Sequence, residues 1–296
     1  MVRVSSCASS QVYDATMRDA LAIPTVKGRK TEREKFAGAD TTYTLEGLMR
    51  DGKALQMGTS HNLGQNFARG FDMRYTDADG EQQLCWTTSW GVSTRTIGAL
   101  IMCHGDDRGL RLPPAVAPVQ AVVLAVRDEV REAAQKLVDD LLVRGVRAHL
   151  DDRTNLGFGR RVTDWELKGV PVRVELGPRD LEQNQATIVR RDSGEKAAIG
   201  LDNAATHVSA LLPDIQAALF AEAETRREQS TFEASTAEDV DAPGFWRIPW
   251  RDLGEAGETA LAERAYSVRC LVTLDGEVPG PRGEGDEDLV AYVSKA

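Results

Sequence analysis

Hydrophobic and polar residues alternate in three stretches of the first third of the chain, a pattern that predicts β-strands. The stretches read TTYTLEGLM, KALQMGTSH and FDMRYTDADGEQQLCWTTSW. Within the last of them, TDADG at residues 76–80 has the composition of a tight turn and predicts a hairpin. Helix-like runs at residues 14–21 and 63–70 complete a mixed region that we expect to be mainly antiparallel.

The pattern changes after a proline-rich run at residues 110–120, which marks a predicted boundary because proline interrupts helices and weakens strand pairing. The buried-strand pattern AVVLAV at 121–126 is followed by apolar residues at helical spacing in 127–144. Further strands and helices then alternate. This order predicts a small α/β layer structure with a mostly parallel or mixed sheet.

The last third of the chain predicts a long amphipathic helix at 207–227 and a small terminal unit. An acidic, turn-rich linker at 231–243 precedes the strand-like segments SVRCLVTL and DLVAYVS. We therefore expect a multidomain chain of the α/β and α+β classes. Its predicted domains cover residues 1–116, 117–222 and 223–296.

Composition narrows the class of protein. The 296 residues are 42% hydrophobic and 28% charged, which is ordinary for a globular protein. No apolar run reaches the roughly 18 residues of a membrane span, so we expect a cytoplasmic protein without membrane contact. The net charge of −10 argues against indiscriminate nucleic-acid binding. A locally basic face is still expected from Arg153, Arg160, Arg161, Lys168, Arg173 and Arg179.

One long block holds the most specific motifs. KFAGAD, TSHNLGQNF, TSWGVSTR and HGDDRGLRLPP follow one another in this order. Together they resemble the catalytic domain of prolyl-tRNA synthetases, class IIa aminoacyl-tRNA synthetases, of the archaeal and eukaryotic type. The resemblance covers roughly residues 15–296. It implies the C-terminal part of a class II antiparallel-sheet catalytic domain within residues 1–116.

The resemblance implies a ligase that joins proline to tRNA(Pro) with ATP and its Mg²⁺. It places the ATP contacts at Gln56, Thr59, Ser93 and Arg95. It places the proline pocket at Phe36, Ser60, His61 and Trp90, and gives Arg95 and His61 the catalytic roles. A planar, permanently charged guanidinium suits phosphate oxygens, and flat aromatic walls suit a ring-shaped apolar substrate.

Two structural alternatives stand beside these roles. Arg95 can be an ordinary surface arginine, and His61 a hydrogen-bonded structural histidine.

Strand alternation predicts which of these side chains share a face of their strand. Gln56, Gly58 and Ser60 are expected on one face, and Thr59 and His61 on the other.

A second block, DDRTNLGFGRRVTDWELKGVPVRVELGPRDLEQNQATIVRR, resembles the anticodon-binding domain of class IIa synthetases. The resemblance implies base-reading roles for Glu166, Arg173, Arg179 and Asp180. Carboxylates accept from guanine N1 and N2, and arginine donates to O6 and N7, which suits a guanine-rich anticodon. The alternative is that Glu166 and Arg173 form an ion pair between a helix and a strand.

The terminal unit resembles a C-terminal domain that in many synthetases of this type holds zinc through four cysteines. Here Cys270 alone lies near the expected positions, and Cys7, Cys85 and Cys103 are far from it in sequence. One thiol cannot build a tetrahedral site, so we expect no structural zinc.

The first two class II signatures, including an arginine for the α-phosphate, are not found in the sequence. Two interpretations stay open: a prolyl-tRNA synthetase, as a truncated chain or completed by another polypeptide, or a catalytically inactive paralogue that binds tRNA or protein. For the isolated chain we expect no proline-dependent exchange of pyrophosphate into ATP. A homodimer or a complementing polypeptide is left open as a partner.

Overall fold

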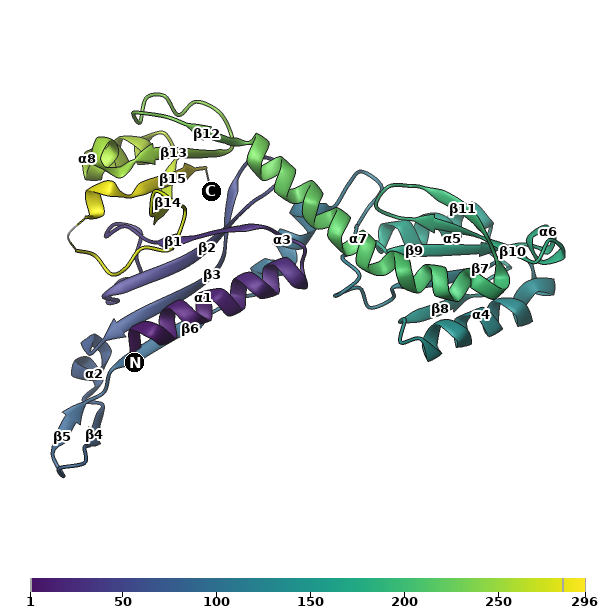
Figure 1. Cartoon of the computed structure of the whole chain (residues 1–296), viewed down its shortest axis with the longest axis horizontal. Coiled ribbons are helices and arrows are strands. Elements are labelled where there is room, and N and C mark those ends of the chain that lie inside the picture. The colour runs from purple at the N-terminus through teal and green to yellow at the C-terminus, as the bar shows by residue number, and fades with distance from the viewer. Residues whose placement is uncertain (1, 284, 296) are drawn as a thin grey trace. The chain divides into compact units, whose positions relative to one another are not determined.

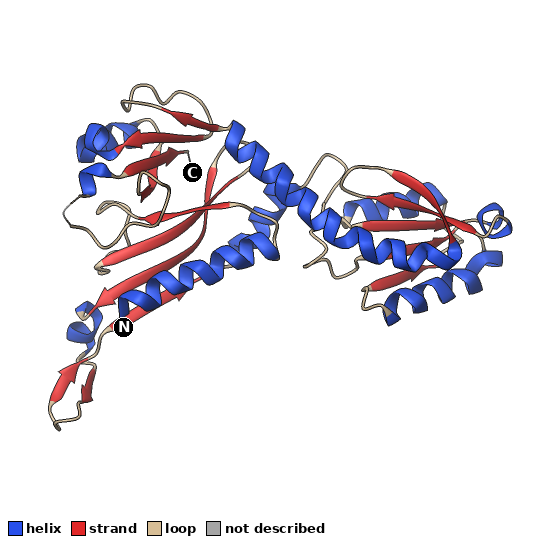
Figure 2. Cartoon of the chain, viewed as in Figure 1, coloured by secondary structure: helices blue, strands red, loops and turns tan. Residues whose placement is uncertain are grey.

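The computed structural model describes residues 2–283 and 285–295. The chain divides into two compact units. The first contains residues 1–18, 23–99 and 224–296, and the second contains residues 19–22 and 100–223. Figure 1 labels the helices and strands, and Figure 2 separates them by colour.

An eight-stranded sheet forms the framework of the first unit, in the order β12-β13-β15-β14-β1-β2-β3-β6. The strands are β1 (Thr25–Arg29), β2 (Thr41–Leu48), β3 (Ala54–Gly64), β6 (Thr87–Gly91), β12 (Thr231–Glu233), β13 (Phe245–Pro249), β14 (Ser267–Val272) and β15 (Val290–Ser294). Every neighbouring pair in this sheet is antiparallel apart from β12 and β13. The predicted antiparallel character is confirmed.

Helices and a small hairpin accompany this sheet. They are α1 (Val2–Asp19), α2 (Asn66–Phe71), α3 (Arg95–His104), α8 (Trp250–Glu263), the 3₁₀ turn η2 (Asp286–Asp288), and strands β4 (Arg74–Thr76) and β5 (Gln82–Leu84). The hairpin turn forms at the TDADG sequence, where the carboxylate of Asp77 accepts the backbone N–H groups of Asp79 and Glu81. Figure 1 shows α1 running alongside β3 and β6.

The segment expected as a separate terminal domain adds its strands to the first sheet. Strand β14 pairs with β1 through Arg29 and Leu271, and residues 224–296 group with residues 23–99. Residues 231–243, expected as a linker, begin with β12. The sheet continues from one segment into the other because β1 and β14 satisfy each other's backbone hydrogen bonds.

A five-stranded mixed sheet, β11-β10-β9-β7-β8, forms the second unit. Strands β7 (Ala121–Ala125), β8 (Ala148–Asp151) and β9 (Val172–Leu176) are parallel, and β10 (Gln185–Arg190) and β11 (Lys196–Gly200) are antiparallel. The predicted α/β organisation with a mixed sheet is confirmed. Its helices are η1 (Asp128–Val130), α4 (Arg131–Val143), α5 (Phe158–Leu167), α6 (Pro178–Glu182) and, up to residue 223, α7 (Leu201–Gln229).

Helices cover both faces of the second sheet. On one face, α4 and α7 pack against alternate strand residues such as Val123, Val174 and Ile188. On the other face, Trp165 of α5 packs against Val122 and Leu124. The buried strands therefore carry apolar residues at successive positions, as strands covered on both sides do. No helix in the described part of the chain is long and apolar enough to cross a membrane.

Candidate functional site

A β-bulge in β3 decides which predicted site residues share a face of the first sheet. Gln56 lies opposite Glu46 on β2, whereas Gly58 lies opposite the adjacent Leu45, so Met57 has no cross-strand partner. Directly opposed residues in antiparallel strands project to the same face. The prediction that Gln56 shares a face with Gly58 and Ser60 is therefore wrong.

With the bulge included, Gln56 joins the face of Thr59 and His61, which lie opposite Thr44 and Thr42. All three side chains are partly exposed. One face of β3 thus presents an amide, a hydroxyl and an imidazole in succession.

Phe36 and His61 come together at this face. Their ring centroids are 5.0 Å apart, with the planes tilted by 47°. The hydroxyl of Thr42 lies 3.0 Å from Nδ1 of His61 and also accepts the backbone N–H of Phe36 at 3.1 Å. Partial burial lowers the pKa of His61 below its ordinary value, which favours the neutral imidazole. Phe36 continues into a row of stacked rings with Phe67 and Phe71.

Ser60 and Trp90 do not join Phe36 and His61. The strand pairing sets Trp90 of β6 opposite Ser60 and sets Ser89 opposite His61. Ser60 and Trp90 therefore project from the opposite face of the sheet to His61. Ser60 is buried there and Trp90 is half exposed. The structure does not assemble the four-residue proline pocket that the resemblance implied.

Arg95, the first residue of α3, reaches the edge of β3. Its Nη1 lies 3.5 Å from the backbone oxygen of Gln56, and its backbone N–H donates to the hydroxyl of Ser93 at 3.2 Å. Ser93 and Arg95 are both exposed. The positive charge of Arg95 therefore stands beside Gln56, one of the other predicted ATP contacts.

A buried charged cluster lies on the same face of β2 and was not predicted from the sequence. Glu46 accepts Lys30 Nζ at 2.9 Å, the hydroxyl of Thr44 at 2.7 Å and Arg269 Nη2 at 2.8 Å. Burial works to raise the pKa of Glu46, but the charges of Lys30 and Arg269 outweigh it, so this pKa lies below its ordinary value. The cluster could have been expected from one sequence feature, the glutamate inside the otherwise uncharged strand TTYTLEGL.

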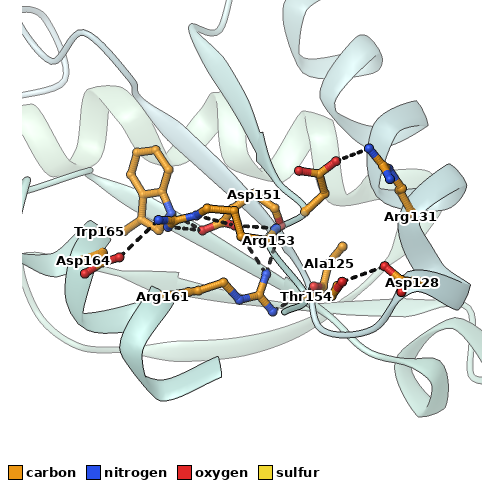
Figure 3. Close-up of polar contacts among 10 residues, drawn as sticks. Ala125, Asp128, Arg131, Asp151, Arg153, Thr154, Arg161, Asp164 and Trp165 are labelled. Carbon is orange, nitrogen blue, oxygen red and sulfur yellow. Dashed lines mark hydrogen bonds and ion pairs between the residues drawn. The ribbon is translucent and has the colours of Figure 1, made fainter. Parts of the chain in front are cut away.

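The second unit has its own buried polar network, around Asp151 at the end of β8 (Figure 3). Its carboxylate accepts Arg153 Nη2 at 2.7 Å and Trp165 Nε1 at 2.6 Å, and Arg161 Nη1 lies 3.4 Å away. Arg161 also donates to the backbone oxygens of Asp151 and Ala125. The network ties α5 to the ends of β7 and β8.

Two members of the expected basic face are buried instead. Arg161 is 1% exposed and Arg173 is 9% exposed. Arg161 is held by the Asp151 network, and Arg173 donates to Glu166 at 3.1 Å and to Glu175 at 2.8 Å. The helix-to-strand ion pair between Glu166 and Arg173 therefore exists, as the structural alternative for these residues required.

Arg179 and Asp180 lie on α6, beyond the other end of β9. Arg173 is near the start of that strand, so the two pairs are separated by roughly 10 Å of extended backbone or more. Asp180 accepts the backbone N–H of Gly177 at 2.9 Å and caps α6. Arg179 is exposed. The four predicted base readers therefore form two separate pairs.

Known proteins resemble this chain both in the second unit and along nearly its whole length. A sequence profile described as an anticodon binding domain matches residues 120–211, within the second unit. The "Proline--tRNA ligase" of Frankia alni is 54% identical over 291 residues, which are 97% of this chain and 62% of that relative. Over nearly its whole length the chain is similar to proline–tRNA ligases.

Further relatives match the chain over a similar range. The "Proline--tRNA ligase 2" of Streptomyces avermitilis is 54% identical over 96% of this chain and 61% of its own length. The "Proline--tRNA ligase" of Alkaliphilus oremlandii is 46% identical over 88% of this chain and 56% of its own length. The chain thus spans about three fifths of the length of the curated relatives that it matches.

Proposed function

We propose that this protein takes part in the ATP-dependent attachment of proline to tRNA(Pro). The observation that supports this most is the 54% identity to a proline–tRNA ligase across 97% of the chain. In such a reaction the proline carboxylate attacks the α-phosphorus of ATP and pyrophosphate leaves. The site must hold two anions and a secondary ammonium, and positioning with electrostatics supplies most of the rate. Mg²⁺ bound to ATP and a cytoplasmic location belong to the same proposal.

The nucleotide is assigned to Gln56, Thr59, Ser93 and Arg95. Gln56 and Thr59 share a face of β3, and the guanidinium of Arg95 stands at the edge of that strand, 3.5 Å from the Gln56 oxygen. Arg95 is exposed, so it can meet a phosphate or stack on a base. Its proposed role is to stabilise the charge on the phosphates during activation.

Proline is assigned to the surface beside His61 and Phe36. The Thr42 hydroxyl accepts the Phe36 N–H, and its own hydrogen can be donated to His61 Nδ1. We assign the neutral imidazole the tautomer with its proton on Nε2, which this hydrogen bond would stabilise and from which it can donate to the substrate carboxylate. Phe36 provides an apolar wall, and it is 47% exposed. Ser60 and Trp90 are left out, since they lie on the other face of the sheet.

The second unit is assigned to anticodon recognition. Arg179 is the exposed cation for guanine O6 and N7, and Asp180 lies next to it on α6. Glu166 and Arg173 already form a hydrogen bond with each other. To contact a base, they must either keep this bond and add one to the base, or replace it. Arg179 is therefore the first residue to substitute in a test of anticodon reading.

Two binding measurements test the proposal. We expect calorimetric titration with a non-hydrolysable prolyl-adenylate analogue to show at least tenfold tighter binding than with the alanyl analogue. We also expect a gel shift to show weaker binding of tRNA(Pro) once its anticodon is altered. Equal affinity for both adenylates would contradict the proline site, and equal affinity for both tRNAs would contradict anticodon reading.

A further inference from the structure

A cavity in the first unit lies between the segment that follows β1 and helix α8. Its volume is about 440 Å³, within the range of small-molecule sites. Thr31, Arg33, Trp250 and Glu258 are among the residues that line it. None of the residues assigned above to ATP or proline lines this cavity.

The charges around the cavity are mostly paired with one another. Arg29 forms an ion pair with Asp286 at 2.8 Å, and Lys35 forms one with Glu32 at 2.9 Å. Arg282 lies 3.4 Å from Glu255. These pairs leave the wall of the cavity close to electrically neutral.

Glu258 takes part in no such pair among the described residues. It is only 3% exposed, and its one hydrogen-bond donor in the described part of the chain is the Thr31 hydroxyl, 2.6 Å from Oε1. No Lys, Arg or His of residues 2–283 and 285–295 lies within ion-pair distance of it. Burial raises the pKa of Glu258, and the Thr31 hydrogen bond offsets this only in part. A buried carboxylate is costly unless a cation or several donors compensate it.

We propose that this cavity binds a small organic cation, an ammonium or amidinium group on an apolar body, with Glu258 as its counter-ion. The cation would form the direct ion pair that no described residue forms with Glu258. Trp250 offers an indole surface for the apolar body, and an indole also attracts a nearby cation. The site is independent of the proposed ligase function, because it shares none of the residues assigned to it.

Benzylamine is a suitable probe, with benzyl alcohol as its neutral counterpart of similar shape. In calorimetric titrations of the whole chain near neutral pH, benzylamine should bind at least tenfold more tightly than benzyl alcohol. Glu258→Gln keeps an acceptor for Thr31 and removes the charge, so it should abolish this preference. Glu263→Gln is the matched control, since it removes an exposed carboxylate on the same helix that does not line the cavity, and it should leave the preference unchanged.

Two results would overturn the proposal: equal affinity of the wild-type protein for both probes, or an unchanged preference in Glu258→Gln. A pH series on the wild-type protein keeps the test independent of how that variant folds. Benzylamine affinity should fall as the pH is lowered through the raised pKa of Glu258, whose charged neighbours are Arg33, Glu34 and Glu255. An affinity that stays constant over this range would also count against the site.

Discussion

The guanidinium of Arg269 and the carboxylate of Glu46 lie 2.8 Å apart in the interior of the first unit, although 223 residues separate them in the chain. Lys30 occupies the other carboxylate oxygen. Glu46 lies opposite Gln56 in the sheet, so the cluster lies on the face that carries the candidate site. Arg269, on β14 near the C-terminus, therefore helps to stabilise that face.

Replacing Arg269 by Met should destabilise the first unit by about 3 kcal/mol or more, because Glu46 would stay buried with half of its compensation removed. Urea unfolding of the variant and the wild-type protein measures this difference. Arg251→Met is the control, since Arg251 pairs with Asp288 at 3.6 Å with both side chains more than half exposed. A change in Arg269→Met no larger than in this control would show that the cluster contributes little.

Local patterns predicted much of the fold, because strand and helix periodicity depends on neighbouring residues. The TDADG hairpin and the alternation of strands and helices after residue 120 follow from such patterns. The pairing of β1 with β14 does not, since it joins residues about 240 positions apart and depends on the folded backbone.

Less of the candidate site was predictable, because its geometry depends on strand pairing and packing and not on neighbouring residues alone. The resemblance named Phe36 and His61, which do meet, but alternation gave the wrong face for Gln56. A bulge is a matter of cross-strand register, and one extra residue reverses every later position on the strand. The burial of Arg161 likewise depends on Asp151 and Ala125, which approach it only through the packing of α5 on the sheet.

Gly64→Ala should destabilise the region that follows β3. Gly64 has a φ of +54°, and a Cβ atom there would lie 2.1 Å from Oδ2 of Asp40. We expect a cost of about 2 kcal/mol or more from the strained backbone and the displaced carboxylate together. Gly91→Ala is the control, because a Cβ at Gly91 meets open space. Equal unfolding free energies for the two variants would contradict this account.

The second unit should lose stability in acid through Asp106. Hydrogen bonds from Arg191 lower the pKa of Asp106 to about 2 from an ordinary value near 3.8. Since the folded-state pKa is the lower one, the stabilisation is fully present above about pH 4 and is lost as the pH falls toward 2. Its size is on the order of 1 to 2 kcal/mol.

Arg191→Met tests this assignment. The variant should be less stable than the wild-type protein at pH 5, and the difference should shrink by pH 3. Urea unfolding at pH 5, 4 and 3 measures both effects, with Arg144→Met as an exposed control. A difference that does not change with pH would mean that Arg191 acts through packing and not through the charge of Asp106.

Asp151→Asn should disorder the junction between β8 and α5. The substitution removes the charge that compensates Arg161, which is 1% exposed, and weakens the bonds to Arg153 and Trp165. A loss of about 3 kcal/mol is expected, as for other buried pairs that lose one partner. Asp164→Asn removes a partly exposed carboxylate from the same network and should cost less than 1 kcal/mol. Amide hydrogen exchange in α5 distinguishes the two variants, and equal protection would contradict the central role of Asp151.

Thr42→Val should weaken proline recognition without removing any residue that we assign to the substrate. The Thr42 hydroxyl links Phe36 N–H to His61 Nδ1, so its loss frees the imidazole to change tautomer and rotate. We expect about tenfold weaker binding of the prolyl-adenylate analogue, equivalent to about 1.4 kcal/mol. Thr16→Val, which alters an exposed hydroxyl on α1, is the control. Nitrogen NMR of the His61 ring should show one neutral tautomer in the wild-type protein and a mixture in Thr42→Val. Unchanged affinity together with an unchanged tautomer would show that Thr42 does not position the imidazole.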